Sequence, residues 1–140
     1  MAELDHIRSS LDNIAQDHFF DDSSTEVVER WELESIGFEA VEPVLAFMEE
    51  HPYVDFGSPG ALTHFIEKFH RRGYDEALLS SVKRRPTPHT VWLLNRLING
   101  EHDESVRLAQ ISLMREAAAN QSASLETRST AAGFLMRLGG

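Results

Sequence analysis

Apolar residues recur along the chain at spacings of three and four, which is the period of an amphipathic helix. The first stripe of this kind consists of Leu4, Ile7, Leu11 and Ile14. Expected helix starts recur roughly every 15 residues, proline and glycine lie in several of the breaks between them, and no segment alternates apolar and polar positions as a half-buried strand does. The pattern therefore predicts an all-α protein of about seven helices.

The second expected helix lies between a serine pair and a glycine. Ser23 or Ser24 is expected to cap its first turn, because a serine hydroxyl can accept a hydrogen bond from a free backbone amide there. Gly37 is expected to end the helix in a left-handed conformation. The outward side of this helix carries acidic residues and, unusually, Leu33.

Two later helices share a start signal, a hydroxyl residue followed by proline. Ser58-Pro59 and Thr87-Pro88 each match an N-cap with proline in the first helical position. They predict helices over 59–72 and 88–99. The second of these is apolar on nearly every side, which predicts a place at the centre of the domain.

The expected helices each have a single apolar stripe and short connections. Consecutive helices should therefore pack antiparallel as helical hairpins. Stacked hairpins form an α-solenoid similar in shape to HEAT repeats, although the chain has no strict sequence repeat. The length of 140 residues is typical of one domain, so we expect residues 1–140 to form a single all-helical domain.

The amino-acid composition excludes several classes of protein and of functional site. Cysteine is absent, which excludes a disulfide scaffold, a thiol nucleophile and thiolate metal sites. No apolar run is long enough to span a membrane, and the N-terminus lacks the apolar segment of a signal peptide. We therefore expect a cytoplasmic protein that does not bind membranes.

The charge is distributed unevenly. The net charge is −10, but residues 1–56 carry fifteen Asp or Glu against two Arg, a net of −13, whereas residues 57–140 have a net of +3. Nucleic acids and anionic lipids repel such a chain, so we expect neither as a partner. The acidic part is either a solvated surface or a docking surface for a basic partner, whose association it would accelerate.

Motifs with catalytic or metal-binding potential are incomplete. The segment around Ser58 is not a nucleophile elbow, because Phe56 stands where that motif needs glycine. Glu67 and His70 have the spacing of a di-iron ligand pair, but the chain has no second Glu-x-x-His. We therefore expect no enzyme, no catalytic residue, no metal site and no cofactor.

Two polar residues interrupt the apolar helix 88–99. Asn95 must be hydrogen-bonded if it is buried, and Arg96 beside it needs an acidic partner. They indicate either a structural polar network or a small groove that faces a partner.

Two stretches carry a family resemblance, residues 56–67 (FGSPGALTHFIE) and 86–99 (PTPHTVWLLNRLIN). Together with the acidic first part, they resemble small all-helical immunity proteins of bacterial contact-dependent inhibition and polymorphic-toxin systems. The similarity covers about residues 52–100 of this chain. It implies a cytoplasmic protein without enzymatic activity that binds and neutralises one cognate toxin, often a nuclease, and no catalytic residues carry over.

The charge pattern and the resemblance together predict a partner-binding surface for a basic protein toxin. Carboxylates would occupy or cover the cationic cleft of a nuclease, and apolar side chains would supply affinity. The alternatives are a helical adaptor in a larger assembly and an enzyme of unrecognised type. The predicted partner-binding residues are Phe19, Phe20, Asp21, Asp22, Glu26, Glu29, Leu33, Glu39 and Glu50.

Overall fold

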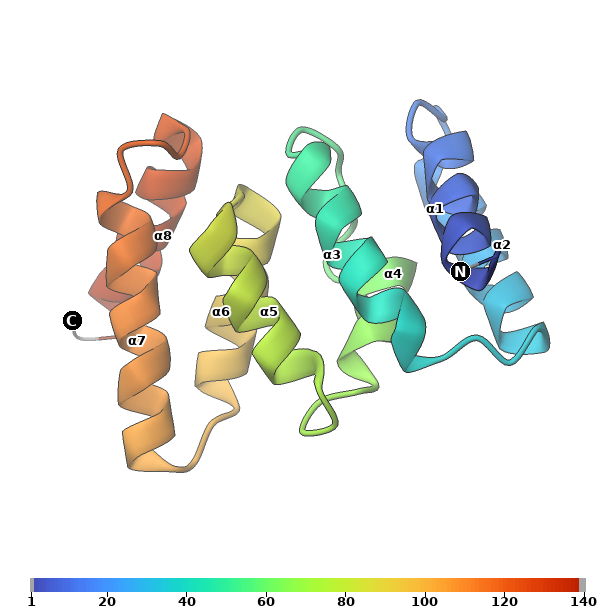
Figure 1. The fold of residues 1–140 in the computed structure, drawn as a ribbon. Coiled ribbons are helices and arrows are strands. Elements are labelled where there is room, and N and C mark those ends of the chain that lie inside the picture. The colour runs from blue at the N-terminus through green and yellow to red at the C-terminus, as the bar shows by residue number, and fades with distance from the viewer. Residues whose placement is uncertain (1, 139–140) are drawn as a thin grey trace. The chain divides into compact units, whose positions relative to one another are not determined.

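The computed structural model describes residues 2–138 (Figure 1). All regular secondary structure in that range is helical, and the all-α prediction is confirmed. Eight α-helices and one 3₁₀ turn are present there, one α-helix more than the approximate number predicted. None of these helices is long and apolar enough to cross a lipid bilayer.

The helices follow one another with short connections. They are α1 (Ala2–Ile14), α2 (Phe20–Leu33), the 3₁₀ turn η1 (Phe38–Ala40), α3 (Val41–Glu50), α4 (Ala61–Glu67), α5 (Tyr74–Arg84), α6 (Pro88–Asn99), α7 (Glu104–Ala119) and α8 (Leu125–Arg137).

The chain divides into two compact units, residues 1–77 and residues 78–140. No linker marks this division in the sequence, because it falls inside α5. The division also separates the charge, with −13 on the first unit and +3 on the second. The single domain and the solenoid stacking stay predictions, and each unit is described by itself.

The first unit is built around one aromatic pair. Helix α1 packs against α2 and α3, and α4 packs against the same two helices. The Trp31 side chain of α2 is fully buried, and its ring meets that of Phe65 from α4 edge-on, with 5.4 Å between the centroids. Ile7 of α1 and Met48 of α3 are also fully buried. The apolar stripes of four helices therefore share one core, as helices with a single apolar face require.

The second unit contains most of α5 and a core shared by α6, α7 and α8, which all pack against one another. Helix α6 begins with the start signal predicted from the sequence. The Thr87 hydroxyl accepts a hydrogen bond from the Thr90 amide (3.2 Å), and the Thr90 hydroxyl accepts one from the Thr87 amide (3.1 Å). This reciprocal capping box confirms the predicted helix 88–99.

The predicted cap at Ser58 is wrong. Helix α4 begins at Ala61, two residues after Pro59, and its N-cap position is Gly60, with φ of +85°. A Cβ atom at Gly60 would lie 1.8 Å from the Phe56 carbonyl oxygen, so only glycine fits there. The sequence signal failed because the chain turns back on itself before the helix can start.

Both predicted ends of the second helix are also wrong. Helix α2 begins at Phe20, before the serine pair, because the Asp17 carboxylate accepts hydrogen bonds from the Phe19 amide (2.8 Å) and the Ser23 hydroxyl (2.7 Å). At the other end, Ser35 and not Gly37 takes the left-handed conformation, with φ of +59°. Gly37 has φ of −126° and precedes η1.

The outer side of α6 differs from the prediction of a helix that is apolar all round. Trp92 is half-buried, and its ring lies tilted against that of His89 (5.3 Å between centroids) and under the Arg96 guanidinium (5.0 Å). Asn95 is half-buried as well. The aromatic ring therefore supports a polar surface here by cation–π contact.

Candidate protein-binding surface

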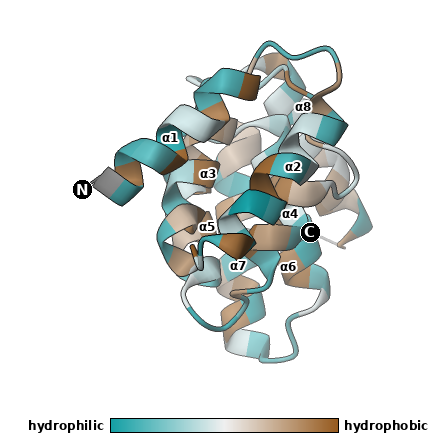
Figure 2. Cartoon of the chain, turned by 90° about the vertical axis from the view of Figure 1, so that its right-hand side faces the viewer, coloured by the Kyte–Doolittle hydropathy of each residue, from teal (hydrophilic) through white to brown (hydrophobic). Residues whose placement is uncertain are grey.

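The exposed side of α2 carries a row of three carboxylates, Asp22, Glu26 and Glu29, which we call the acidic row. Their spacing of four and three residues puts them about one helical turn apart, or roughly 5.4 Å along the axis. The opposite side of α2 is the buried side, with Val27 and Trp31. Hydrophilic positions are visible along α1 and α2 in Figure 2, which looks onto these two helices.

The charge of the acidic row is not compensated within the described chain. None of its three carboxylates makes a hydrogen bond or an ion pair with another residue of the range 2–138. Nearby, Glu32 does pair with Lys68, at 3.0 Å. Uncompensated surface charge attracts an oppositely charged partner over a distance set by the ionic strength.

Exposed apolar side chains flank the two ends of the acidic row. Leu33 at the last position of α2 is 87% exposed, and Phe19 just before its first position is 73% exposed. Large apolar side chains with this exposure, surrounded by charge, are typical of anchors in protein–protein contacts. Leu33 and the acidic row lie on α2, and Phe19 stands at its N-cap, because the helix begins earlier than the serine pair predicted.

The neighbouring Phe20 has a different environment. Its side chain is half-buried, with its ring parallel to that of Phe47 (6.4 Å between centroids, 6° between planes) and edge-on to that of Phe56 (5.7 Å). Phe20 thus packs the start of α2 against α3 and the 51–60 loop. It contributes to the core of the first unit more than to its surface.

Asp17 and Asp21 lie around the first turn of α2. The Ser23 hydroxyl and the Phe19 amide, which both donate to the Asp17 carboxylate, lower the pKa of Asp17 below its usual value. Asp21 is exposed, and its carboxylate has no hydrogen-bond partner among the described residues. Negative charge at this end of α2 is favourable because the free amides make it partly positive.

Glu39 lies outside α2, in η1, and its carboxylate is engaged. It accepts a hydrogen bond from the Gly37 amide and shares one with the Glu3 carboxyl of α1. This shared hydrogen bond raises the pKa of Glu3 and lowers the pKa of Glu39. Glu39 therefore links η1 to α1 and has less freedom to meet a partner than the acidic row has.

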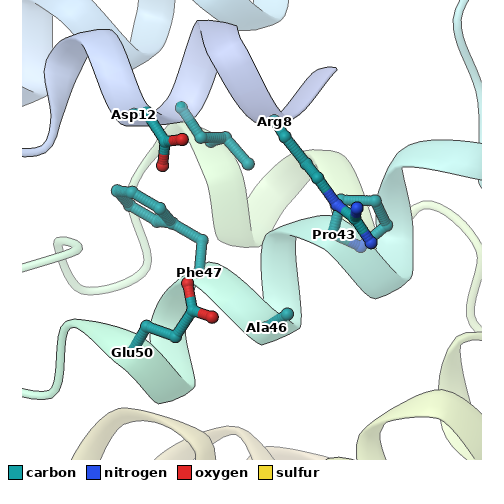
Figure 3. Close-up of a pocket in the computed structure, with 7 residues that line it drawn as sticks. Arg8, Asp12, Pro43, Ala46, Phe47 and Glu50 are labelled. Atoms are coloured by element: carbon teal, nitrogen blue, oxygen red, sulfur yellow. The ribbon is translucent and has the colours of Figure 1, made fainter. Parts of the chain in front are cut away.

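Glu50, at the end of α3, lines a groove of about 450 Å³ between α1 and α3 (Figure 3). We call it the α1–α3 groove. Its lining residues are Arg8, Leu11, Asp12, Pro43, Ala46, Phe47 and Glu50. Helices α1 and α3 pack against each other.

The nine predicted residues therefore do not form one cluster. Seven of them belong to α2 or stand at its first cap, whereas Glu39 lies in η1 and Glu50 in the α1–α3 groove. The other groove residues were not predicted from the sequence, because each is ordinary by itself. The signal that could have found them is the helical spacing of Arg8 with Asp12 and of Pro43 with Glu50, which places each pair on one side of its helix.

The histidine and acidic residues do not gather into a metal site in the described chain. No group of three or more His, Asp or Glu side chains between residues 2 and 138 is placed to hold a metal ion. His70, one of the residues considered for a di-iron pair, instead lies 2.8 Å from the Asp75 carboxylate. This contact fixes the turn between α4 and α5.

Comparison with other proteins adds no further constraint. No family model, curated protein or solved structure matches the chain. The features of the first unit that bear on function are therefore its charges, its exposed apolar side chains and its groove.

Proposed function

We propose that the chain is an immunity protein that binds a basic cognate bacterial toxin and neutralises it. The observation that carries the proposal is the acidic row of α2, uncompensated by other described residues and flanked by the exposed Phe19 and Leu33. Charge of this kind sets the rate and specificity of association, and apolar anchors supply most of the affinity.

The charge of the first unit supports a basic partner. The toxin class that suits it best is a nuclease, because a cleft that binds a polyanionic substrate must be rich in Lys and Arg. Carboxylates repeated at each turn of one helix offer such a cleft a row of negative charges in place of phosphates. The proposed role is therefore to occupy or cover the substrate cleft, with no chemical step by the immunity protein.

The resemblance of residues 56–67 and 86–99 to immunity proteins supports the same function from a different part of the chain. In the structure these segments contribute core side chains and helix starts: Phe56, Phe65, Leu94 and Ile98 are buried. The resemblance thus concerns the scaffold, whereas the contact surface is proposed on α2.

The proposal is tested by co-purification with the product of the adjacent reading frame. The two proteins are expressed together, captured through a tag on this chain and eluted with a salt gradient. We expect one basic protein that is toxic when expressed alone and that elutes at raised salt. A partner that is not toxic, or a large assembly, would contradict the immunity function and favour a helical adaptor.

A further inference from the structure

We propose that the α1–α3 groove receives an arginine side chain of the protein partner. This inference deepens the proposed function, on which it rests for the basic character of the partner. It assigns a specific side chain to a specific place in the first unit. The groove lies beside α2 and not on it, so it would be a second point of contact.

The groove has its shape because two helical stripes face each other. Arg8, Leu11 and Asp12 lie at spacings of three and four on α1, and Pro43, Ala46, Phe47 and Glu50 repeat the same spacings on α3. Both sets therefore line a single cleft along the helix pair. The small side chain of Ala46 leaves the space between them open, and Ala46 itself is half-exposed.

The two ends of the groove differ in charge. The Asp12 and Glu50 carboxylates lie toward one end, and the Arg8 side chain extends toward Pro43 at the other (Figure 3). Neither carboxylate makes a hydrogen bond or ion pair with a residue of the described range, and both side chains are exposed. Asp12 and Arg8 are four residues apart, yet no ion pair joins them.

A guanidinium group suits the acidic end better than other cations do. Asp12 and Glu50 come from two different helices at the same end of the groove, and the planar guanidinium has five N–H donors that point in several directions toward such carboxylates. The side chain that carries it also has an apolar stem. Leu11 and Phe47 provide the apolar floor for that stem, with only 1% and 3% of their own surface exposed.

The floor of the groove is held in place by aromatic packing. The Phe47 ring is flanked by Phe20 at 6.4 Å and by His51 at 4.3 Å between centroids. The His51 Nδ1 atom lies 2.9 Å from the Phe47 carbonyl oxygen. A groove that is already formed costs less conformational entropy on binding than one that must be ordered. The net charge of −13 on the surrounding unit selects a cationic occupant over an anionic one.

The test uses three short peptides and the full-length protein labelled with ¹⁵N. The peptides are acetyl-Gly-Arg-Gly-amide, the same peptide with lysine, and the same peptide with citrulline, which keeps the shape of arginine without its charge. We expect the arginine peptide to shift backbone amide signals of residues 8–12 and 43–50 at millimolar concentration. The lysine peptide should bind several-fold more weakly, and the citrulline peptide should cause no saturable shift.

Three variants locate the site. Asp12→Asn with Glu50→Gln removes both carboxylates and should weaken binding of the arginine peptide about tenfold, as expected for two lost charge-assisted contacts. Ala46→Leu fills the groove without changing any charge and should abolish the shifts altogether. Glu116→Gln with Glu126→Gln removes the same charge from exposed positions of the second unit and serves as the matched control, with binding nearly unchanged.

The outcomes of this test distinguish a failure of the proposed arginine site from a failure of the proposed immunity function. Shifts spread over all acidic helices, equal binding of the lysine peptide, or full binding by Ala46→Leu would each overturn the arginine site. Such a result leaves the proposed function open to its own test, since co-purification with the toxin does not depend on the peptide. Conversely, saturable binding of the arginine peptide by a protein that has no toxic partner would support the arginine site and contradict the immunity function.

Discussion

The rings of Phe20 and Phe47 lie parallel, with their centroids 6.4 Å apart, and join the first turn of α2 to the floor of the α1–α3 groove. The residue before Phe20, Phe19, is 73% exposed beside the same turn. Two adjacent phenylalanines thus have opposite roles, one in the core and one on the surface. The acidic row and the groove both belong to the first unit.

This pair of phenylalanines gives the first prediction. Phe20→Ala should lower the free energy of unfolding by about 2 kcal/mol, less than for a fully buried ring because Phe20 is half-buried. Phe19→Ala should leave stability unchanged and weaken toxin binding. Urea unfolding followed by circular dichroism, together with binding measured on the captured toxin, distinguishes the two roles. Equal loss of stability in both variants would contradict the assignment.

Charge reversal on the acidic row should slow association. Glu26→Lys with Glu29→Lys replaces two exposed, uncompensated carboxylates, so the association rate at low salt should fall about tenfold or more while the fold is kept. The matched control is Glu116→Lys with Glu126→Lys, which changes the net charge equally on exposed positions of the second unit. Stopped-flow mixing with the toxin measures both. If the two double variants slow association to the same extent, the contact surface is not on α2.

The capping box of α6 should contribute measurably to stability. Thr87→Ala removes the hydroxyl that satisfies the Thr90 amide, and the side chain is buried, so the free energy of unfolding should fall by about 1–2 kcal/mol. Thr87→Ser keeps the hydroxyl and should lose much less. Thermal unfolding of the three proteins checks this. A serine variant as unstable as the alanine variant would show that the threonine methyl, and not the cap, matters.

Asp103 makes the stability of the second unit depend on pH. Its carboxylate accepts hydrogen bonds from the Ser105 hydroxyl (2.8 Å) and from the Val106 (3.2 Å) and Ser105 (3.0 Å) amides, which lower its pKa. A lowered pKa stabilises the folded form above the usual pKa of about 3.9, and this contribution disappears as pH falls through the lowered value. The melting temperature of Asp103→Asn should therefore fall less between pH 7 and pH 3 than that of the natural protein does. An identical loss would exclude Asp103 as a source of acid sensitivity.

The contribution of Glu3 to folding stability should depend on pH in the opposite direction. Its shared hydrogen bond with Glu39 raises the pKa of Glu3. The stability that this hydrogen bond contributes is therefore present below the usual pKa of about 4.3 and is lost as pH rises through the raised value. Glu3→Gln keeps a donor toward Glu39 at every pH and should raise the melting temperature at pH 7 but not at pH 3. Glu42→Gln, at another exposed carboxylate, is the control. A rise at both pH values would indicate a gain unrelated to the Glu3–Glu39 pair.

Sequence patterns predicted the parts of this fold that depend on neighbouring residues. The helix 88–99 has the predicted start because Thr87, Pro88 and Thr90 form its cap locally. Helix α4 was misplaced because Ser58 and Pro59 lie in an irregular turn, in which Gly60 with its positive φ comes close to the Phe56 carbonyl and takes the N-cap position. Local signals thus predict an element where its residues follow a regular pattern, and not where an irregular turn intervenes.

The candidate site follows the same rule. The acidic row and Leu33 were predicted because one helix presents them at regular spacing. Phe20 packs on Phe47, 27 positions further along the chain, and the groove joins residues of α1 and α3 that are more than 30 positions apart. Periodicity can show which residues share a side of one helix, but it carries no information about which helices pack together. No local pattern could show that Glu39 would be engaged by Glu3.

The central claim, neutralisation of a basic toxin through the acidic row, is tested most directly by growth. The product of the adjacent reading frame is induced in bacteria together with the natural protein, with Glu26→Lys/Glu29→Lys, or with Glu116→Lys/Glu126→Lys, at equal amounts of each. The account predicts full growth with the natural protein and with the second-unit variant, and arrest with the α2 variant. Arrest with the natural protein, or full growth with the α2 variant, would contradict it.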